Sequence, residues 1–156
     1  MRRAARGRLA IIAPLAAGAL ALLATGCSSS SNLTPGRLQA SLGATFANLY
    51  VLQQSEMGNP PVTAVGLDSQ ASCQKGGTLD VVQSGSGVWL CEITYLVAGP
   101  GYPVIAKYNV NVQTDGCYAA DGDGPASVNG SPTITGPGYK QVVNPVYLID
   151  GCFDTT

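Results

Sequence analysis

Histidine is absent from this 156-residue chain, and only 11% of its residues are charged. Without histidine, the histidine-based zinc and haem sites and a cysteine–histidine catalytic pair are excluded. Glutamate occurs only as Glu56 and Glu92, and the sequence places neither beside a partner carboxylate for acid–base chemistry. A phosphate-binding loop and a dinucleotide-binding glycine fingerprint are also missing. We therefore expect a chain without a cofactor or a metal, and a binding protein rather than an enzyme.

Two short motifs are weak indications of chemistry. Residues 72–75, Ser-Cys-Gln-Lys, match the Ser-x-x-Lys motif of penicillin-binding enzymes, and residues 127–129 match Ser-x-Asn. That serine should open a helix, whereas here it lies in a glycine-rich β segment, and no Lys-Thr-Gly follows. Residues 121–124, Asp-Gly-Asp-Gly, begin like a calcium loop but have no closing glutamate downstream. We expect turns and loops at all three places.

The amino terminus has the pattern of a bacterial export signal. Residues 1–8 contain four arginines and no acid, and residues 9–24 carry no charge. A basic start followed by a short apolar run is typical of a secretory signal peptide. The run is shorter than the roughly 20 residues that a spanning helix needs. Residues 24–27, Ala-Thr-Gly-Cys, resemble the bacterial lipobox, and this resemblance implies cleavage before Cys27 and a diacylglycerol thioether on its sulfur.

These features predict three segments. Residues 1–26 would be a lipoprotein signal peptide, residues 27–33 a serine-rich flexible tether, and residues 34–156 a single domain. An anchor of two or more acyl chains on Cys27 would hold the protein stably on the extracytoplasmic face of the cell membrane. Two alternatives stay open, an ordinary cleavage site beside an incidental cysteine and an uncleaved membrane anchor.

The chain from Cys27 onward is acidic. Four basic and nine acidic residues give it a formal charge of −5. Nucleic-acid binding depends on basic surface, so a nucleic-acid partner is not expected. A polybasic patch for anionic lipid is likewise not expected, and the lipid on Cys27 would be the only link to the membrane.

Four cysteines remain once Cys27 is assigned to the lipid, and an even number in an exported chain indicates two disulfides. Four cysteines allow three pairings. Residues 88–97 and 104–112 alternate between apolar and polar side chains, so they predict two half-buried strands joined as a hairpin. With both apolar faces inward, the loop length suggests that Trp89 faces Val112, Cys91 faces Val110 and Ile93 faces Tyr108.

This register disfavours one of the pairings. Cys117 would lie well beyond the partner of Cys91, and a disulfide needs Cα atoms within about 7 Å of each other. We therefore favour Cys73–Cys91 and Cys117–Cys152. The two bridges would contribute about 3 and 4 kcal/mol through loop entropy.

The rest of the pattern predicts an α+β fold with one N-terminal helix packed on an antiparallel sheet. Thr34 and Pro35 are typical of a helix start, and Gly58 followed by two prolines ends the helix near residue 57. One apolar stripe runs along it, formed by Leu38, Leu42, Phe46 and Leu49. Short strand-like segments follow at residues 62–67, 78–83, 117–118 and 146–149, with a long loop over 121–137.

The aromatic residues divide into two groups. Trp89, Tyr95, Tyr108, Tyr118 and Tyr147 could form a ligand platform, but an apolar strand face is more often part of the core. Tyr102 and Tyr139 lie in loops rich in glycine and proline. We take these two as the candidate ligand contacts.

Three stretches resemble uncharacterised small exported domains of high-GC Gram-positive bacteria. They are VWLCEITY at 88–95, KYNVNVQTDGCYAADG at 107–122 and NPVYLIDGCFD at 144–154. The resemblance implies a family but no activity. Our first hypothesis is a lipid-anchored, non-enzymatic surface module that binds a protein or an envelope polymer. A cell-envelope hydrolase is the second, and a deep pocket lined by two or more acids would favour it. A purely structural or immune-exposed surface protein is the third.

Overall fold

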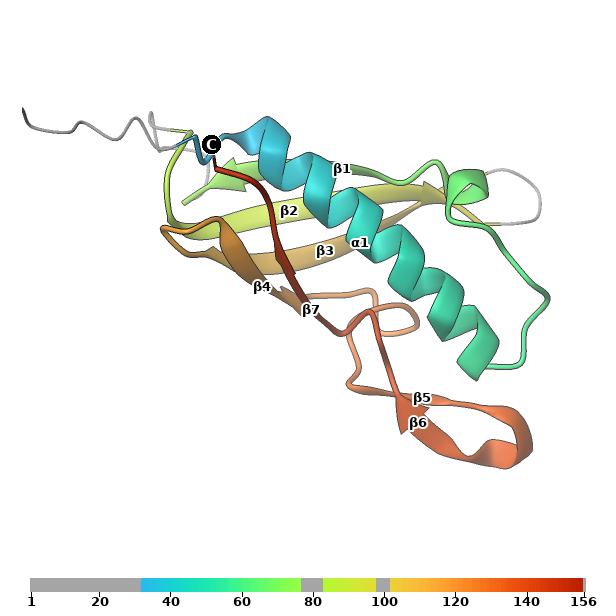
Figure 1. The fold of residues 1–156 in the computed structure, drawn as a ribbon. Helices are drawn as coiled ribbons and strands as arrows, with labels where there is room; N and C mark the ends of the chain where they lie inside the picture. Colours follow the sequence, from blue (N-terminus) through green and yellow to red (C-terminus); the bar gives the residue numbers. More distant parts are fainter. Residues whose placement is uncertain (1–31, 77–82, 98–101, 156) are drawn as a thin grey trace, which may run out of the picture.

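One long helix, α1 (Pro35–Glu56), lies along one side of an antiparallel five-stranded sheet (Figure 1). This is a computed structural model, and it describes residues 32–76, 83–97 and 102–155. Across the sheet the strands are β1 (Gln70–Lys75), β2 (Gly87–Leu96), β3 (Pro103–Val112), β4 (Cys117–Gly122) and β7 (Leu148–Cys152). We call the face toward α1 the inner face and the opposite face the outer face. The predicted α+β class is confirmed.

Helix α1 begins and ends as the sequence indicates. Thr34 has extended backbone angles and Pro35 takes the first helical position, although the Thr34 side chain makes no capping hydrogen bond. Gly58, with φ of 71°, follows the last turn in a left-handed conformation that glycine adopts without strain. Three members of the predicted stripe, Leu38, Leu42 and Phe46, are buried, whereas Leu49 is only partly buried. The buried side of the helix continues instead through Tyr50 and Gln53.

The core lies between α1 and the inner face of the sheet. Strand β2 alternates strictly, so that Trp89, Cys91, Ile93 and Tyr95 are at most 2% exposed while the residues between them face solvent. Phe46 of α1 packs among the inner-face tyrosines, with its ring centroid 4.9 Å from that of Tyr95. Of the five aromatic residues that we expected to pack in the core, Trp89, Tyr95, Tyr108 and Tyr118 are buried, whereas Tyr147 is only partly buried.

The register of the central hairpin differs from the predicted one by two residues. Trp89 faces Val110, Cys91 faces Tyr108 and Ile93 faces Ala106. A shift of two residues keeps every side chain on its own face, so the hydrophobic pattern cannot distinguish the two registers. The observed register places Glu92 directly opposite Lys107. This cross-strand charge pair was the signal in the sequence that would have selected it.

Both predicted disulfides are present, and each joins an edge strand to its neighbour. Cys73 of β1 faces Cys91 of β2 with Cα atoms 4.1 Å apart, and Cys117 of β4 faces Cys152 of β7 at 3.9 Å. These short separations are typical of non-hydrogen-bonded pairs in an antiparallel ladder. The first bridge is buried on the inner face, whereas the second lies on the outer face, where Cys152 is exposed.

A second, smaller sheet contains β5 (Thr133–Thr135) and β6 (Gln141–Val143), joined through the short helix η2 (Pro137–Tyr139). This hairpin projects near the carboxyl end of α1, in orange and red in Figure 1. A Cβ atom on Gly136 would lie 2.8 Å from the carbonyl oxygen of Glu56, so glycine permits this close approach. The hairpin begins within the stretch 121–137 that the sequence predicted to be a loop, and β4 ends within the same stretch.

Three further segments were predicted to be short strands. Residues 62–67 form a loop and the 3-10 helix η1 (Val65–Leu67), where the N–H of Gly66 donates to Oγ1 of Thr63. The segment predicted at 78–83 lies outside the described residues except for its last position. The final strand, predicted at 146–149, is β7 and begins two residues later.

Candidate functional site

The outer face of the large sheet is uncovered by any other described element, and it displays apolar side chains. Five of the eleven large apolar residues that the described segments expose lie there, each between 40% and 58% exposed: Val88, Leu90, Leu96, Ile105 and Leu148. They come from β2, β3 and β7, and they point outward because their neighbours point into the core. The outer face therefore has the apolar content of an interaction surface.

A hollow of about 310 Å³ lies in this face across β1, β2 and β3. Leu90 is part of its wall, together with Glu92 and Lys107, whose charged atoms are 3.4 Å apart. The side chains of this ion pair are 56% and 58% exposed, so the hollow is open to solvent. The polar members of its lining are Ser72, Gln74 and Asp123, which supply hydroxyl, amide and carboxylate groups.

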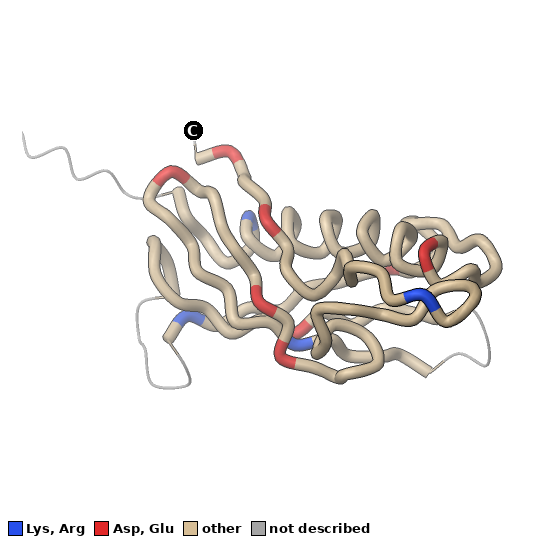
Figure 2. Tube along the Cα trace, turned by 90° about the horizontal axis from the view of Figure 1, so that it is seen from below, with Lys and Arg blue, Asp and Glu red and all other residues tan. Residues whose placement is uncertain are grey.

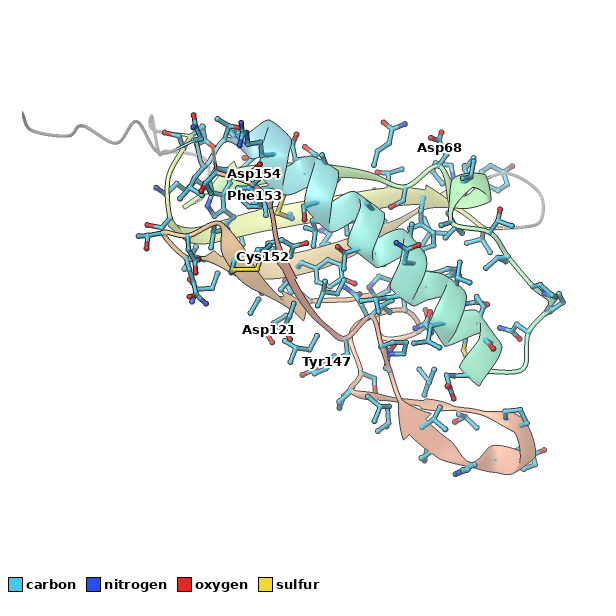
Figure 3. The ribbon with its side chains drawn as sticks, in the orientation of Figure 1. Asp68, Asp121, Tyr147, Cys152, Phe153 and Asp154 are labelled. Atoms are coloured by element: carbon cyan, nitrogen blue, oxygen red, sulfur yellow. A yellow bond between two sulfur atoms is a disulfide. The ribbon has the colours of Figure 1, made fainter. Side chains whose placement is uncertain are left out.

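Acidic residues predominate on the outer face. Strand alternation places Asp121 of β4 and Asp150 of β7 there, and Asp123 continues from the end of β4 with its N–H donating to the carbonyl oxygen of Lys107. Figure 2 shows how thinly charge is spread over the chain, with acids more frequent than bases. Figure 3 shows Asp121 and Cys152 near opposite ends of the β4–β7 pair. Within the described part of the chain, none of these three aspartates forms an ion pair.

A buried polar network holds the connection between β4 and β5 against the helix. Gln53 of α1 donates from Nε2 to Oδ1 of Asn144 at 2.8 Å and to the carbonyl oxygen of Val128 at 2.7 Å. Asn144 donates in turn to the carbonyl oxygens of Val128 and Ser131. Gln53 and Asn144 are at most 2% exposed, and their side-chain amides form hydrogen bonds with other protein atoms. The network is therefore structural, and sequence reasoning missed it because its members are far apart in the chain.

The inner-face tyrosines are part of the core rather than a ligand platform. Burial raises the pKa of the Tyr95 and Tyr108 hydroxyls well above the usual value near 10, and it raises the pKa of Tyr50 in the same way. The Tyr108 hydroxyl donates to the carbonyl oxygen of Val146 at 2.7 Å. These phenols are protonated over the physiological pH range, and their rings pack in the core.

The two tyrosines chosen as candidate ligand contacts are both exposed, Tyr102 at 82% and Tyr139 at 92%. Tyr102 precedes β3, whereas Tyr139 ends η2 at the tip of the small hairpin. Neither lines the hollow, and no ring contact or hydrogen bond between them is found in the described residues. Their role as ligand contacts stays a prediction, and the structure does not bring them together.

The motifs set aside in the sequence have no catalytic arrangement. Ser72 points outward from β1, whereas Lys75 lies three residues along the strand and donates from Nζ to the carbonyl oxygen of Ser84 at 2.6 Å. Positions three apart on a strand face opposite sides, so this pair does not form the helical Ser-x-x-Lys site. Among residues 32–76, 83–97 and 102–155, three or more acidic or sulfur ligands do not gather at any one point.

The two ends of the described chain lie together. Asn32 donates from Nδ2 to the carbonyl oxygen of Thr155 at 2.9 Å, and the N–H of Gly85 donates to that of Leu33 at 2.8 Å. Figure 1 shows the start of α1 beside the carboxyl end. Cys27 and the predicted leader lie outside the described residues. Within those residues, no helix is both long enough and apolar enough to cross a membrane.

Comparisons of the chain with protein-family models, with curated proteins and with solved structures found no match. The family resemblance inferred from the sequence thus stays a prediction, and the site has to be interpreted from its own chemistry.

Proposed function

We propose that this protein is a lipid-anchored module on the extracytoplasmic face of a bacterial cell membrane, and that it binds a protein or an envelope polymer without catalysing a reaction. Two disulfides at opposite edges of one small sheet support the extracytoplasmic part, because such bridges persist in oxidising compartments. The resemblance of residues 24–27 to a lipobox supports the anchor.

The strongest support is the separation between the outer face of the sheet and the end of the domain that the predicted anchor would hold. The tether from Cys27 to Asn32 spans about 20 Å at most when fully extended, and it joins the domain where both ends of the described chain meet. The outer sheet face and the β5–β6 hairpin carry most of the exposed large apolar side chains. On the outer face, Leu96, Ile105 and Leu148 lie at the ends of their strands away from that end. An anchor placed in this way leaves the outer face accessible to a partner.

The anchor is tested by fractionation of cells that produce the full chain. Wild-type protein should sediment with membranes, and mass spectrometry should find Cys27 as the amino-terminal residue with a thioether-linked lipid. Cys27→Ala should prevent lipidation, while Ser28→Ala, the matched control next to it, should change nothing. An unmodified Cys27 in a chain that keeps residues 1–26 would contradict the proposal.

An envelope hydrolase is the second candidate, because Glu92 and Asp123 line the same hollow. Two acids in one cavity were the feature expected to favour an enzyme. The hollow is open, however, and Glu92 is paired with Lys107, which leaves neither acid in an enclosed pocket. The enzyme becomes the better explanation if the purified protein releases soluble fragments from cell walls and both Glu92→Gln and Asp123→Asn abolish that release.

A further inference from the structure

The outer face approaches the size of a protein docking surface. Five strands about 4.8 Å apart and residues about 3.3 Å apart along β2 and β3 give it roughly 19 by 33 Å in projection. Stable protein interfaces bury about 800 Å² on each partner, which is of the same order. Five large side chains on this face remain about half exposed, and four of them lie on the interior strands β2 and β3 rather than at a sheet edge. The face therefore has unsatisfied apolar area that a partner can bury.

The charge of this face has one predominant sign. It carries four carboxylates, Glu92, Asp121, Asp123 and Asp150, and one base, Lys107. Lys107 is paired with Glu92, so the three aspartates leave a net charge of −3. Alternation and strand pairing, rather than closeness in sequence, bring Asp150 of β7 onto the same face as Asp121.

The acids border the apolar residues instead of forming a separate cluster. Asp121 lies directly opposite Leu148 across the β4–β7 ladder, and Asp123 lines the same hollow as Leu90. Apolar and charged groups are therefore interspersed on this face, and protein–protein interfaces use both kinds of contact. In such a surface the apolar groups supply affinity, while the charges select the partner and steer its approach.

We propose that the outer face of the sheet docks a protein whose contacting surface combines cationic and apolar groups. This inference rests on the proposed binding function and names the class of partner. A second copy of this chain would bring one net charge of −3 against another, which charge repulsion opposes. The same charge repulsion disfavours binding of this face to anionic lipid surfaces and to anionic wall polymers. The outer positions of the described strands also carry no aromatic ring on which a neutral sugar would stack.

The test uses the full chain, tagged after Thr156 and produced in a bacterial envelope. Intact cells are treated with a carbodiimide, which couples carboxylates to lysine amines in direct contact, and tagged protein is purified and mapped by mass spectrometry. We expect cross-links from Asp121, Asp123 or Asp150 to lysines of one partner protein. In affinity capture without the carbodiimide, the triple variant D121N/D123N/D150N should lower the recovery of that partner about tenfold, since each exposed charge pair contributes about twofold. Glu56→Gln with Asp68→Asn, two acids off this face, is the matched control.

The outcomes separate this inference from the function on which it rests. Cross-links that map to Glu56 or Asp68, equal capture by the triple variant, or capture of a polymer would overturn the outer-face docking and leave a binding module. Cross-links between two copies of this chain at the outer face would replace the cationic partner with a dimer. Wild-type protein that captures neither protein nor polymer would overturn the binding function as well. Each variant is checked for both disulfides before its capture is compared.

Discussion

The inner and outer faces of the five-stranded sheet come from the same strands, yet they differ in almost every property. On β2 the inner residues are at most 2% exposed, whereas Val88 and Leu90 on the outer side are 58% and 48% exposed. The inner face is apolar and covered by α1, and the outer face is acidic and open. The difference indicates that the inner face carries the stability of this domain and the outer face is free to carry its specificity.

Truncating one residue on each face of β2 tests whether the inner face alone contributes to stability. Ile93→Ala should lower the free energy of unfolding by about 3 kcal/mol, because it leaves a cavity in a packed core. Leu90→Ala, three residues away on the outer face, should lower it by less than about 1 kcal/mol because solvent already reaches that side chain. Urea unfolding of both variants measures the two values. Equal losses would mean that the outer face is also part of a core.

The two disulfides should differ in the rate at which a reductant opens them. Cys117–Cys152 lies on the outer face and is accessible, so a thiol reductant should open it in the folded protein. Cys73–Cys91 is buried beneath α1 and should be reduced only when the domain unfolds, at least about 100-fold more slowly. Alkylation and mass spectrometry at timed intervals would give the order, and simultaneous reduction of both bridges would contradict it.

The buried polar network beneath the helix should contribute more to stability than polar groups of the outer face. Asn144→Ala should lower the free energy of unfolding by about 2 kcal/mol, because it leaves the Gln53 amide and the Val128 carbonyl oxygen short of partners in the core. Asn109→Ala, at an outer position of β3, serves as the control and should have an effect within about 0.5 kcal/mol. Similar values for the two variants would show that water replaces the lost bonds.

Alkaline pH should lower the stability of the domain through the buried tyrosines. The pKa values of Tyr50, Tyr95 and Tyr108 are raised by burial, so the folded protein holds these phenols protonated. In the unfolded chain they ionise near pH 10, so stability should be independent of their titration below about pH 9 and fall as the pH rises above 10. Urea midpoints measured between pH 8 and pH 11 would show this fall, and Tyr95→Phe should reduce it.

The smallest effect is expected for the ion pair of the outer face. Lys107→Met removes the partner of Glu92, but both side chains are more than half exposed. The free energy of unfolding should therefore change by less than about 0.5 kcal/mol. Thermal unfolding at low and high salt would measure it. A loss of several kcal/mol would instead indicate that Glu92 and Lys107 are needed for the register of β2 and β3.

Local pattern alone could predict much of the fold. The spacing of Leu38, Leu42 and Phe46 gives the buried side of the helix, and the alternation along residues 88–97 gives the two faces of a strand. The candidate site was not predicted as a site. Its residues come from five strands, and Asp121 was interpreted only as part of a turn. Tyr102 and Tyr139, selected for their loops, are exposed but lie outside the hollow.

The amino-acid pattern alone indicates which residues are apolar, where the helix begins and ends, and that four cysteines are available for two bridges. The hairpin register, the β5–β6 hairpin and the gathering of three aspartates on one open face became visible only in the folded domain. The cause is the range of the interactions. Periodicity and turn chemistry act over a few residues, whereas register, the Gln53–Asn144 contact and the charge of a sheet face depend on strands that meet only when the chain has folded.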